Sequence, residues 1–408
     1  MLTPLYSYLD KISFRGVQPS LDRIQKAVAL LDHPEKKYKI IHIAGTNGKG
    51  STCHFIAQLL AKNGYQVGLT LSPHVDDYRE RIQISDSQTD AVKKISPEKL
   101  LETHDFLLSR LGENHSLTYF EWTILLALQF FAQSHVDFVV LETGLGGRWD
   151  ASNVVAESFI SGITSVGLDH MDYLGNSLDE ILVEKIQIIK PHSHFVMGPL
   201  QESLNEMAFK HCQKNNVPYY SVSDLVDVFH DVSLDDDTNQ YFKEALRFTR
   251  AVANLLNKKG FSISFEKLCQ SKIMLPPARF EVMCQDPIII RDGAHNQPAL
   301  ERLKSFVDQR WGKEYDLVFG CLKNRDFIKL AQIIQSPHTC YWARFDGGRQ
   351  TTQELVYENA RQELGGEVVS LDQDFKRKIN TRCVKRPLVI CGSFYLCAQF
   401  KKMWEQVD

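Results

Sequence analysis

One short stretch decides the fold: Gly45-Thr46-Asn47-Gly48-Lys49-Gly50-Ser51. It follows an apolar run at 40–44 and opens a segment with helical spacing, which is typical of a loop that holds phosphate groups. Glycines let consecutive backbone N–H groups turn toward a polyphosphate, and Lys49 and the following helix N-terminus add positive charge. In common P-loops the lysine directly precedes Ser or Thr, whereas here Gly50 separates Lys49 from Ser51. We therefore predict a nucleoside triphosphate site that differs from that of ordinary GTPases and kinases.

Short apolar runs alternate with helical segments around this loop. The segment at 51–63 has Ile56, Leu59 and Leu60 at helical spacing, and Gly64 is a suitable helix end. Such alternation predicts a parallel sheet with helices on both faces. We predict strands at 39–44, 66–71, 137–142, 159–165 and 194–197, and polar surface loops at 86–97 and 233–239.

A second alternation begins after Pro276 and Pro277. It predicts strands at 287–290, 316–319, 339–345, 367–371 and 388–391, with helices at 298–309 and 352–363. The expected fold class is α/β with two domains. A P-loop ATPase domain with a doubly wound, mainly parallel sheet occupies 1–276, and a smaller Rossmann-like α/β domain occupies 277–408.

The composition argues against several classes of protein. The 408 residues include 47 Lys and Arg against 50 Asp and Glu, and no basic block marks a nucleic-acid surface. The nine cysteines form no C-x-x-C pair, which fits a reducing compartment. No run approaches the roughly 18 apolar residues of a membrane span. We therefore expect a cytoplasmic monomer that acts on small molecules, without nucleic-acid or membrane partners.

Polar side chains follow several predicted strands. Glu142 ends a strand beside the phosphate loop, a position from which a Walker B carboxylate holds Mg²⁺. His170 is either a second metal ligand or an ordinary surface histidine. Lys185 lies among isoleucines, so its amine either reaches solvent or is desolvated with a lowered pKa. Asp292 either contacts a nucleotide or only forms a turn. The glycines at 144–147 lack the spacing of a dinucleotide fingerprint, which argues against a dehydrogenase.

Together these residues resemble the motifs of the Mur ligase superfamily, and specifically of the folylpolyglutamate synthase/dihydrofolate synthase family. The resemblance spans nearly the whole chain, and the order and spacing of its motifs make it specific. Besides the phosphate loop, the matching motifs are Ser72-Pro73-His74, Glu80-Arg81-Ile82, Phe120-Glu121, the run from Glu142 to Asn153, Gly167-Leu168-Asp169-His170, Glu184-Lys185 and Asp292-Gly293-Ala294-His295-Asn296.

The resemblance implies ATP-dependent amide formation with ATP and Mg²⁺ as cofactors. ATP would phosphorylate a carboxylate of dihydropteroate, of a reduced folate such as tetrahydrofolate, or of both, and the amine of L-glutamate would attack the acyl phosphate. Repeated addition to a folate would build a poly-γ-glutamate tail. The sequence leaves open which acceptor is used and how long the tail becomes.

The resemblance also implies roles for individual residues. The phosphates would be held by Asn47, Gly48, Lys49, Gly50 and Ser51, and further nucleotide contacts would come from Asn254, Arg279, Asp292 and His295. Mg²⁺ would be ligated by Ser72, Glu142 and His170. The catalytic residues would be Lys49, His170 and Lys185, the last in carbamylated form. The pterin substrate would be bound by Phe120, Glu121, Arg148, Trp149 and Asp150. The chain departs from the family pattern at Trp149, Ser152 and Ala278, where Leu, Thr and Gly are expected.

Two other functions are compatible with a phosphate loop. A peptidoglycan-precursor ligase would add an amino acid to a UDP-linked muramyl substrate, but no extra domain for the UDP group is recognisable before Gly45. A nucleotide-dependent switch protein would bind ATP without ligation, but it would not need Lys185, His170 and a second domain.

Overall fold

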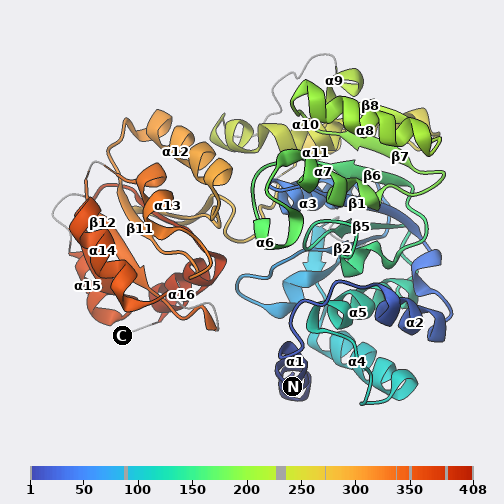
Figure 1. The fold of residues 1–408 in the computed structure, drawn as a ribbon, viewed down its shortest axis with the longest axis horizontal. Helices are drawn as coiled ribbons and strands as arrows, with labels where there is room; N and C mark the ends of the chain where they lie inside the picture. The colour runs from blue at the N-terminus through green and yellow to red at the C-terminus, as the bar shows by residue number, and fades with distance from the viewer. Residues whose placement is uncertain are drawn as a thin grey trace. The chain divides into compact units, whose positions relative to one another are not determined.

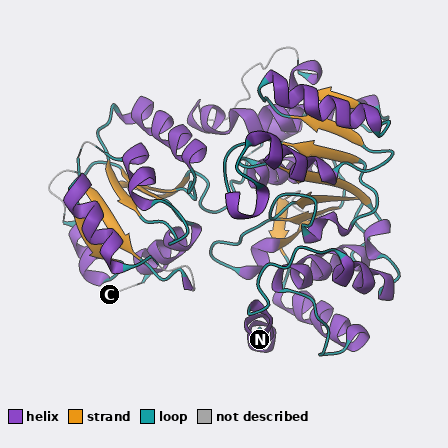
Figure 2. Cartoon of the chain, viewed as in Figure 1, coloured by secondary structure: helices purple, strands orange, loops and turns teal. Residues whose placement is uncertain are grey.

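The chain forms two compact units in the computed structural model, Met1–Met274 and Leu275–Asp408. The structure describes residues 2–86, 91–226, 236–271, 273–336, 338–348, 352–381 and 385–406. Each unit is built on one sheet, and helices alternate with strands along both units (Figures 1 and 2). The sequence places the boundary at 276/277, close to the division at 274/275.

The larger unit contains an eight-stranded, mainly parallel sheet. Its strands are β1 (Lys39–Ala44), β2 (Val67–Thr70), β3 (Ile82–Asp86), β4 (Ala91–Lys94), β5 (Phe138–Glu142), β6 (Ile160–Ile163), β7 (His194–Met197) and β8 (Tyr219–Ser221). They follow the order β4-β3-β2-β5-β1-β6-β7-β8. The central strand β1 is parallel to β5 and β6, and β2 is parallel to β5. β3 and β4 are antiparallel additions at one edge.

Helices cover this sheet, because its central strands are apolar and buried along nearly their whole length. The α-helices are α1 (Thr3–Ser13), α2 (Asp22–Leu30), α3 (Lys49–Lys62), α4 (Pro97–Leu111), α5 (Tyr119–Gln133), α6 (Met171–Leu174), α7 (Leu178–Lys185), α8 (Glu202–Lys214), α9 (Val222–Leu225), α10 (Asp236–Lys258) and α11 (Glu266–Cys269). Short 3₁₀ helices span Pro34–Lys36, Tyr78–Arg81, Ala151–Val154 and Ile186–Ile188.

Two clusters of apolar side chains join the helices to the sheet. In the first, α1, α2, α4 and α5 share a core with strand residues that include Ile40 and Leu141. In the second, α7 and α8 pack against Ile163 and Phe195. Helix α3 lies against β2 and β5 and is itself covered by α10. Among the described residues, no helix is both long enough and apolar enough to cross a membrane.

The smaller unit contains a six-stranded sheet in the order β13-β12-β11-β14-β10-β9. Its strands are β9 (Glu281–Gln285), β10 (Ile288–Arg291), β11 (Asp316–Phe319), β12 (Cys340–Arg344), β13 (Glu367–Ser370) and β14 (Leu388–Cys391). Its helices are α12 (Gln297–Trp311), α13 (Phe327–Ile334), α14 (Glu354–Leu364), α15 (Gln373–Asn380) and α16 (Phe394–Glu405). Only β9 runs antiparallel to its neighbour, β10.

The α/β fold class with mainly parallel sheets is confirmed, but two loop predictions need correction. The polar stretch at 86–97 is not all loop, because it contains the edge strand β4, whose Lys93 and Lys94 face solvent. The acidic stretch at 233–239 lies partly outside the described residues, and its second half is helical because α10 begins at Asp236. Short edge strands such as β4 and β9 carry little apolar periodicity, so the sequence did not reveal them.

Gly68 in β2 provides a test of the packing between sheet and helices. A Cβ atom at this position would lie 2.6 Å from the ring of Phe131, which is fully buried on α5. We predict that Gly68→Ala lowers the free energy of unfolding by about 1–3 kcal/mol through overpacking. Urea denaturation of the purified protein measures this loss.

The matched control is Phe131→Leu, which removes the ring that the new methyl group would meet. In the double variant the two losses should be clearly less than additive. Full additivity would show that the contact between Gly68 and Phe131 does not limit the packing.

Candidate active site

The candidate active site lies at one edge of the larger sheet. Because β1, β2, β5 and β6 are parallel, their carboxyl ends meet at this edge, where ligands bind in doubly wound folds. The order of strands in the sheet reverses at this point. β1 connects through α3 to β2, which lies beyond β5, whereas the later strands β6 and β7 lie on the other side of β1. Four segments follow these strand ends: the phosphate loop at 45–48, the loop at 71–77, the glycine-rich loop at 143–150 and the polar segment at 164–170.

The phosphate loop is held by the segment that follows β6. The amides of Thr46 and Asn47 donate hydrogen bonds to the carbonyl and hydroxyl oxygens of Ser165, both at 2.9 Å. The hydroxyl of Thr164 donates to the carbonyl of Asn47 at 2.8 Å. A Cβ atom on Gly45 would lie 2.1 Å from the Thr164 hydroxyl, so only glycine permits this approach. The loop is therefore held in shape before any nucleotide binds.

Lys49 starts α3 and folds back over the loop. Its Nζ donates to the carbonyl oxygens of Gly45 at 2.8 Å and Thr46 at 3.2 Å. Gly48 precedes it with φ 82°, a left-handed conformation that aims the first turn of α3 at the loop. This arrangement places an ammonium group and a helix N-terminus together, as anion binding requires.

Glu142 and Ser72 meet beside the phosphate loop. Glu142 is the last residue of β5 and is buried, and its Oε2 accepts a hydrogen bond from the Ser72 amide at 2.7 Å. Its own amide donates to the hydroxyl of Thr70 at 3.1 Å. Glu142 is the register partner of Ile43 in β1, two residues before the phosphate loop begins at Gly45.

Oxygen atoms at this position fit a bound Mg²⁺. A buried carboxylate and a neighbouring serine hydroxyl are hard ligands of the kind that Mg²⁺ prefers. Among the described residues, no three His, Cys, Asp or Glu side chains are grouped as a metal cluster. Mg²⁺ sites commonly use one or two carboxylates together with nucleotide phosphates. Ser72 and Glu142 therefore suit a metal ion that is bound together with ATP.

Lys185 ends α7 with only 3% of its surface exposed, so its amine does not reach solvent. Burial, together with a smaller effect from the charge of Lys49, lowers the pKa of Lys185 to about 7, although Asp169 and Asp150 oppose the shift. A large share of the amine is therefore neutral near pH 7. Lys49, Lys185, Asp150 and Asp169 form one group of interacting charges that extends from the phosphate loop.

His170 follows Asp169 directly and has a left-handed backbone with φ 50°. Its ring Nε2 lies 3.9 Å from Asp169 Oδ1, and 39% of its side chain is exposed. The carboxylate of Asp169 is mostly buried and also accepts the His170 amide at 2.8 Å. Asp169 was not singled out from the sequence as a site residue, although its place after a buried strand was the available signal.

The glycine-rich loop at 143–150 is held in place by its last residue, Asp150. Asp150 is buried, and its Oδ2 accepts the Leu145 amide at 2.7 Å while its Oδ1 accepts the amide and hydroxyl of Ser152. The Arg148 amide donates to the Glu184 carbonyl at 3.0 Å, which joins the loop to α7 next to Lys185. Both carboxylate oxygens of Asp150 thus organise the loop itself.

A buried histidine lies beneath this loop and was missed in the sequence. Nε2 of His42 in β1 lies 2.8 Å from the Ser152 hydroxyl and 3.0 Å from the Thr143 hydroxyl. Burial, with a smaller effect from Lys190, lowers the pKa of His42 to about 3, so the ring is neutral. No motif marks a single histidine in an apolar strand, so only the structure reveals its role.

The remaining residues predicted to bind the pterin lie around the same loop. The Phe120 ring packs on Gly144, where a Cβ atom would lie 2.6 Å from Cζ. Trp149 is half exposed, and Arg148 Nε lies 3.4 Å from a carboxylate oxygen of Glu184. Glu121 is buried, caps α5 and forms an ion pair with Arg23 at 3.0 Å. Phe120 and Trp149 therefore have aromatic rings that are partly exposed to solvent, whereas the carboxylate of Glu121 is paired with Arg23.

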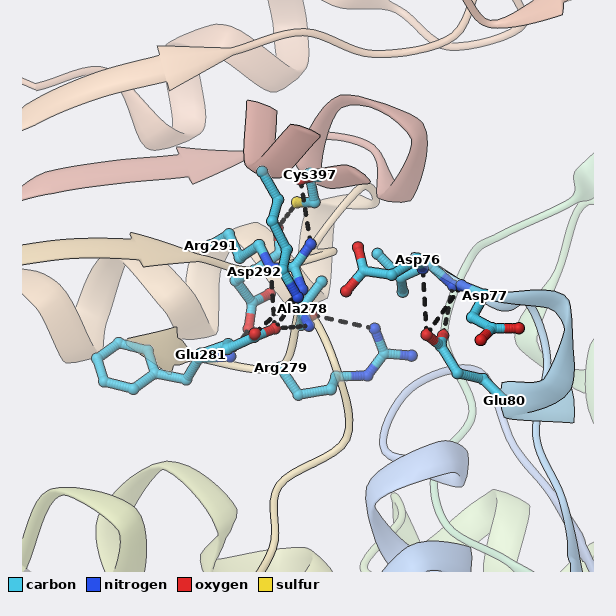
Figure 3. Close-up of polar contacts among 12 residues, drawn as sticks. Asp76, Asp77, Glu80, Ala278, Arg279, Glu281, Arg291, Asp292 and Cys397 are labelled. Atoms are coloured by element: carbon cyan, nitrogen blue, oxygen red, sulfur yellow. Dashed lines mark hydrogen bonds and ion pairs between the residues drawn. The ribbon is translucent and has the colours of Figure 1, made fainter. Parts of the chain in front are cut away.

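Two carboxylates shape backbone turns, one in each unit (Figure 3). In the larger unit, Glu80 is buried and accepts hydrogen bonds from the amides of Val75, Asp76 and Asp77 at 2.7–3.2 Å. In the smaller unit, Asp292 accepts the amides of Phe280 at 2.7 Å and Ala294 at 2.8 Å.

The other residues predicted to contact the nucleotide are distributed over both units. Asn254 lies on α10 and donates to the Leu225 carbonyl at 2.7 Å. In the smaller unit, the Arg279 guanidinium lies 4.2 Å from the centre of the Phe394 ring. Nδ1 of His295 lies 2.7 Å from the Gly293 carbonyl, and its ring also packs against Phe394. Arg279, His295 and Asp292 thus gather around Phe394 and the turn at 278–280.

Comparisons with known proteins agree with this architecture. Residues 43–243 match the Mur ligase middle domain. The dihydrofolate synthase/folylpolyglutamate synthase of Bacillus subtilis is 31% identical over 413 residues, covering 95% of each chain. The enzyme of the same name from Escherichia coli is 29% identical and covers 96% of this chain and 93% of its own.

Solved structures agree over nearly the full length. The bifunctional folylpolyglutamate synthase/dihydrofolate synthase from Yersinia pestis, complexed with AMPPNP and Mn, has a TM-score of 0.83 at 25% identity, covering 99% of this chain and 98% of its own. E. coli FolC in complex with DHPP and ADP has a TM-score of 0.81 at 26% identity, covering 98% and 97%. The chain therefore belongs to the folylpolyglutamate synthase/dihydrofolate synthase family of ATP-dependent ligases.

Proposed function

We propose that this enzyme adds L-glutamate to dihydropteroate, to a reduced folate or to both, through an acyl phosphate. One observation carries the proposal: the buried carboxylate of Glu142 ends the strand beside β1 and its phosphate loop, and the buried Lys185 packs against the glycine-rich loop that follows Glu142. The relatives named for dihydrofolate and folylpolyglutamate synthesis support the choice of substrate. A structure of the same family holds Mn, AMPPNP and L-glutamate, which supports ATP and glutamate as co-substrates.

The proposed reaction has two steps. A carboxylate oxygen of the acceptor attacks the γ-phosphorus of ATP, and ADP leaves as the acyl phosphate forms. The amine nitrogen of glutamate then attacks the carbonyl carbon, inorganic phosphate leaves, and the nitrogen loses a proton as the amide forms. Phosphoryl transfer requires positioning and positive charge more than covalent help from the protein.

The phosphate loop provides this positive charge in the proposal. The amides of Gly48, Gly50 and Ser51 and the N-terminus of α3 bind the phosphates. The Lys49 ammonium exchanges its two loop carbonyls for phosphate oxygens when ATP enters. Mg²⁺, when bound with ATP, neutralises charge on the phosphates. Ser72 and Glu142 would hold it, with His170 as a further ligand.

Acceptor binding is assigned to the surface around the glycine-rich loop. Phe120 and Trp149 offer faces on which an aromatic ring system can stack. Arg148 is partly exposed and offers charge for an acidic group. Asn254, Arg279, Asp292 and His295 are proposed as further residues that support nucleotide binding.

Lys185 is proposed to act as a carbamate. Because burial leaves much of the amine neutral near pH 7, its nitrogen can attack CO₂, and the adduct loses a proton to become an anion. The resulting carboxylate-like group would lie beside Lys49, which stabilises a negative charge. The alternative is an ordinary lysine whose ammonium contacts phosphate, and the two states differ in the sign of their charge.

The acceptor is tested by a product assay. We predict that ATP, Mg²⁺ and L-glutamate, supplied with dihydropteroate or tetrahydrofolate, give a product heavier by one glutamate residue, detected by mass spectrometry. A UDP-muramyl acceptor should give none, because the matching motifs are those of folate ligases. Product from the muramyl acceptor alone would establish the peptidoglycan function instead. ATP hydrolysis that is independent of any acceptor would favour a switch protein.

Removing the Lys49 charge tests the phosphate loop. We predict that Lys49→Ala lowers kcat/KM by at least about a hundredfold, because the charge nearest the transferred phosphate is lost. The matched control is Lys62→Ala at the other end of α3, which should keep normal activity. Circular dichroism should show both variants folded. If Lys49→Ala kept a tenth of wild-type activity, the loop assignment would be wrong.

Chemical rescue tests the carbamate. We predict that Lys185→Ala is inactive and partly regains activity with formate or acetate, since these anions can occupy the vacated negative position. Steady-state rates at increasing formate measure the effect. Lys190 is the matched control: it is also largely buried, and burial lowers its pKa to about 8, but Lys190→Ala should show no response to formate. Rescue by small amines, or near-normal activity of Lys185→Ala without additives, would exclude a carbamate.

A further inference from the structure

The turn before β9 contains two residues in a conformation that side chains disfavour. Ala278 has φ 49° and Phe280 has φ 45°, and both lie in the left-handed region although neither is glycine. Each such residue costs free energy and persists only where the surrounding structure enforces it. Arg279 lies between them, so its side-chain direction is set by two disfavoured backbone conformations.

Three hydrogen bonds enforce this turn, and Figure 3 includes the carboxylates of Glu281 and Asp292 that accept two of them. The Ala278 amide donates to Glu281 Oε2 at 2.7 Å, and the Ala278 carbonyl accepts the Gly293 amide at 2.8 Å. The Phe280 amide donates to Asp292 Oδ2 at 2.7 Å. The residues on either side of Arg279 are therefore both held by carboxylates.

Glu281 is itself held by a buried arginine. Arg291 in β10 is fully buried and binds both carboxylate oxygens of Glu281, with Nε at 2.9 Å from Oε2 and Nη2 at 3.0 Å from Oε1. Its third nitrogen, Nη1, donates to the Cys397 carbonyl of α16 at 3.2 Å. A rigid planar fork thus connects α16 to the turn.

The same helix supplies the surface on which Arg279 rests. The Arg279 guanidinium lies over the ring of Phe394, the first residue of α16. Gly293 makes room for this ring, because a Cβ atom there would lie 2.0 Å from Phe394 Cε1. Arg291 and Phe394 therefore fix both the backbone and the side chain of Arg279 to one helix.

We propose that Glu281 and Arg291 are a positioning pair that sets the turn at 278–280 and thereby aims Arg279 at the nucleotide. The inference rests on the proposed nucleotide role of Arg279. Arg291 is fully buried and the Glu281 side chain is 28% exposed, and an ion pair that buries an arginine adds little net stability compared with apolar residues of the same size, so stability alone does not account for it. Fixing one side chain within a few tenths of an ångström is a role for which a rigid, bidentate pair is suited.

A double-mutant cycle tests this role with the intact enzyme. The variants are Glu281→Gln, Arg279→Ala and their combination, and the readout is the KM for ATP beside kcat and the midpoint of thermal unfolding. We expect Glu281→Gln to raise the KM for ATP by about tenfold with a much smaller change in kcat. In the Arg279→Ala background the same substitution should leave KM unchanged, while still lowering the unfolding midpoint.

The matched control is Glu367→Gln, which removes an exposed ion pair with Lys378 in the same unit and should leave KM unchanged. Because Glu281→Gln leaves a buried charge without its partner, it can unfold the unit. The combined variant Glu281→Gln with Arg291→Met removes both charges and keeps the volume filled. It should fold and show the same rise in KM.

The outcomes distinguish the nucleotide role of Arg279 from the positioning role of Glu281. If Arg279→Ala leaves the KM for ATP unchanged, Arg279 has no nucleotide role and the positioning proposal falls with it. If Arg279→Ala raises KM but the folded Glu281 variants do not, only the positioning role is wrong. If the effects of Glu281→Gln and Arg279→Ala on KM are additive, Glu281 acts independently of Arg279, which also overturns the proposal.

Discussion

The close approach of the phosphate loop to the segment after β6 is the constraint on which the site depends. Gly45 passes so near to Thr164 that no side chain fits, and hydrogen bonds from Thr46 and Asn47 to Ser165 fix the distance. This contact exists because β1 and β6 are parallel neighbours whose carboxyl ends coincide. It brings the segment carrying Asp169 to the loop, so that a change in this register would separate the charges around Lys185.

The charges around Lys185 show how burial changes chemistry. A lysine in water has an amine that is almost fully protonated at neutral pH, whereas desolvation and the charge of Lys49 favour the neutral form here. Burying this amine opposes folding at any pH below the ordinary pKa of lysine, because the amine must lose either its proton or its hydration when the chain folds. The apolar core of α7 and α8, which includes Ile186 and Ile188, offsets this cost.

The sequence predicted the parts of the fold that repeat a pattern. The strand at 388–391 is a continuous apolar run and that at 316–319 is apolar after Asp316, and the structure has both at the same residues. β4 and β9 were missed because edge strands are exposed on one side and need no apolar run. Within the site, the phosphate loop and Glu142 were recognisable from local motifs. His42 acts through contacts between distant segments, and a single sequence contains no record of those contacts.

The buried carboxylates explain why residue roles are harder to predict than motifs. Glu80 and Asp150 direct carboxylate oxygens at backbone amides of their own loops, and Asp292 accepts one amide from its own loop and one from the turn before β9. A carboxylate that shapes a loop and one that binds a ligand look identical in sequence, because both follow a strand and adjoin glycines. The difference is visible only in how many of its oxygens the chain itself engages. By that criterion Asp150 and Asp292 organise backbone, because both oxygens of each carboxylate accept hydrogen bonds from backbone amides.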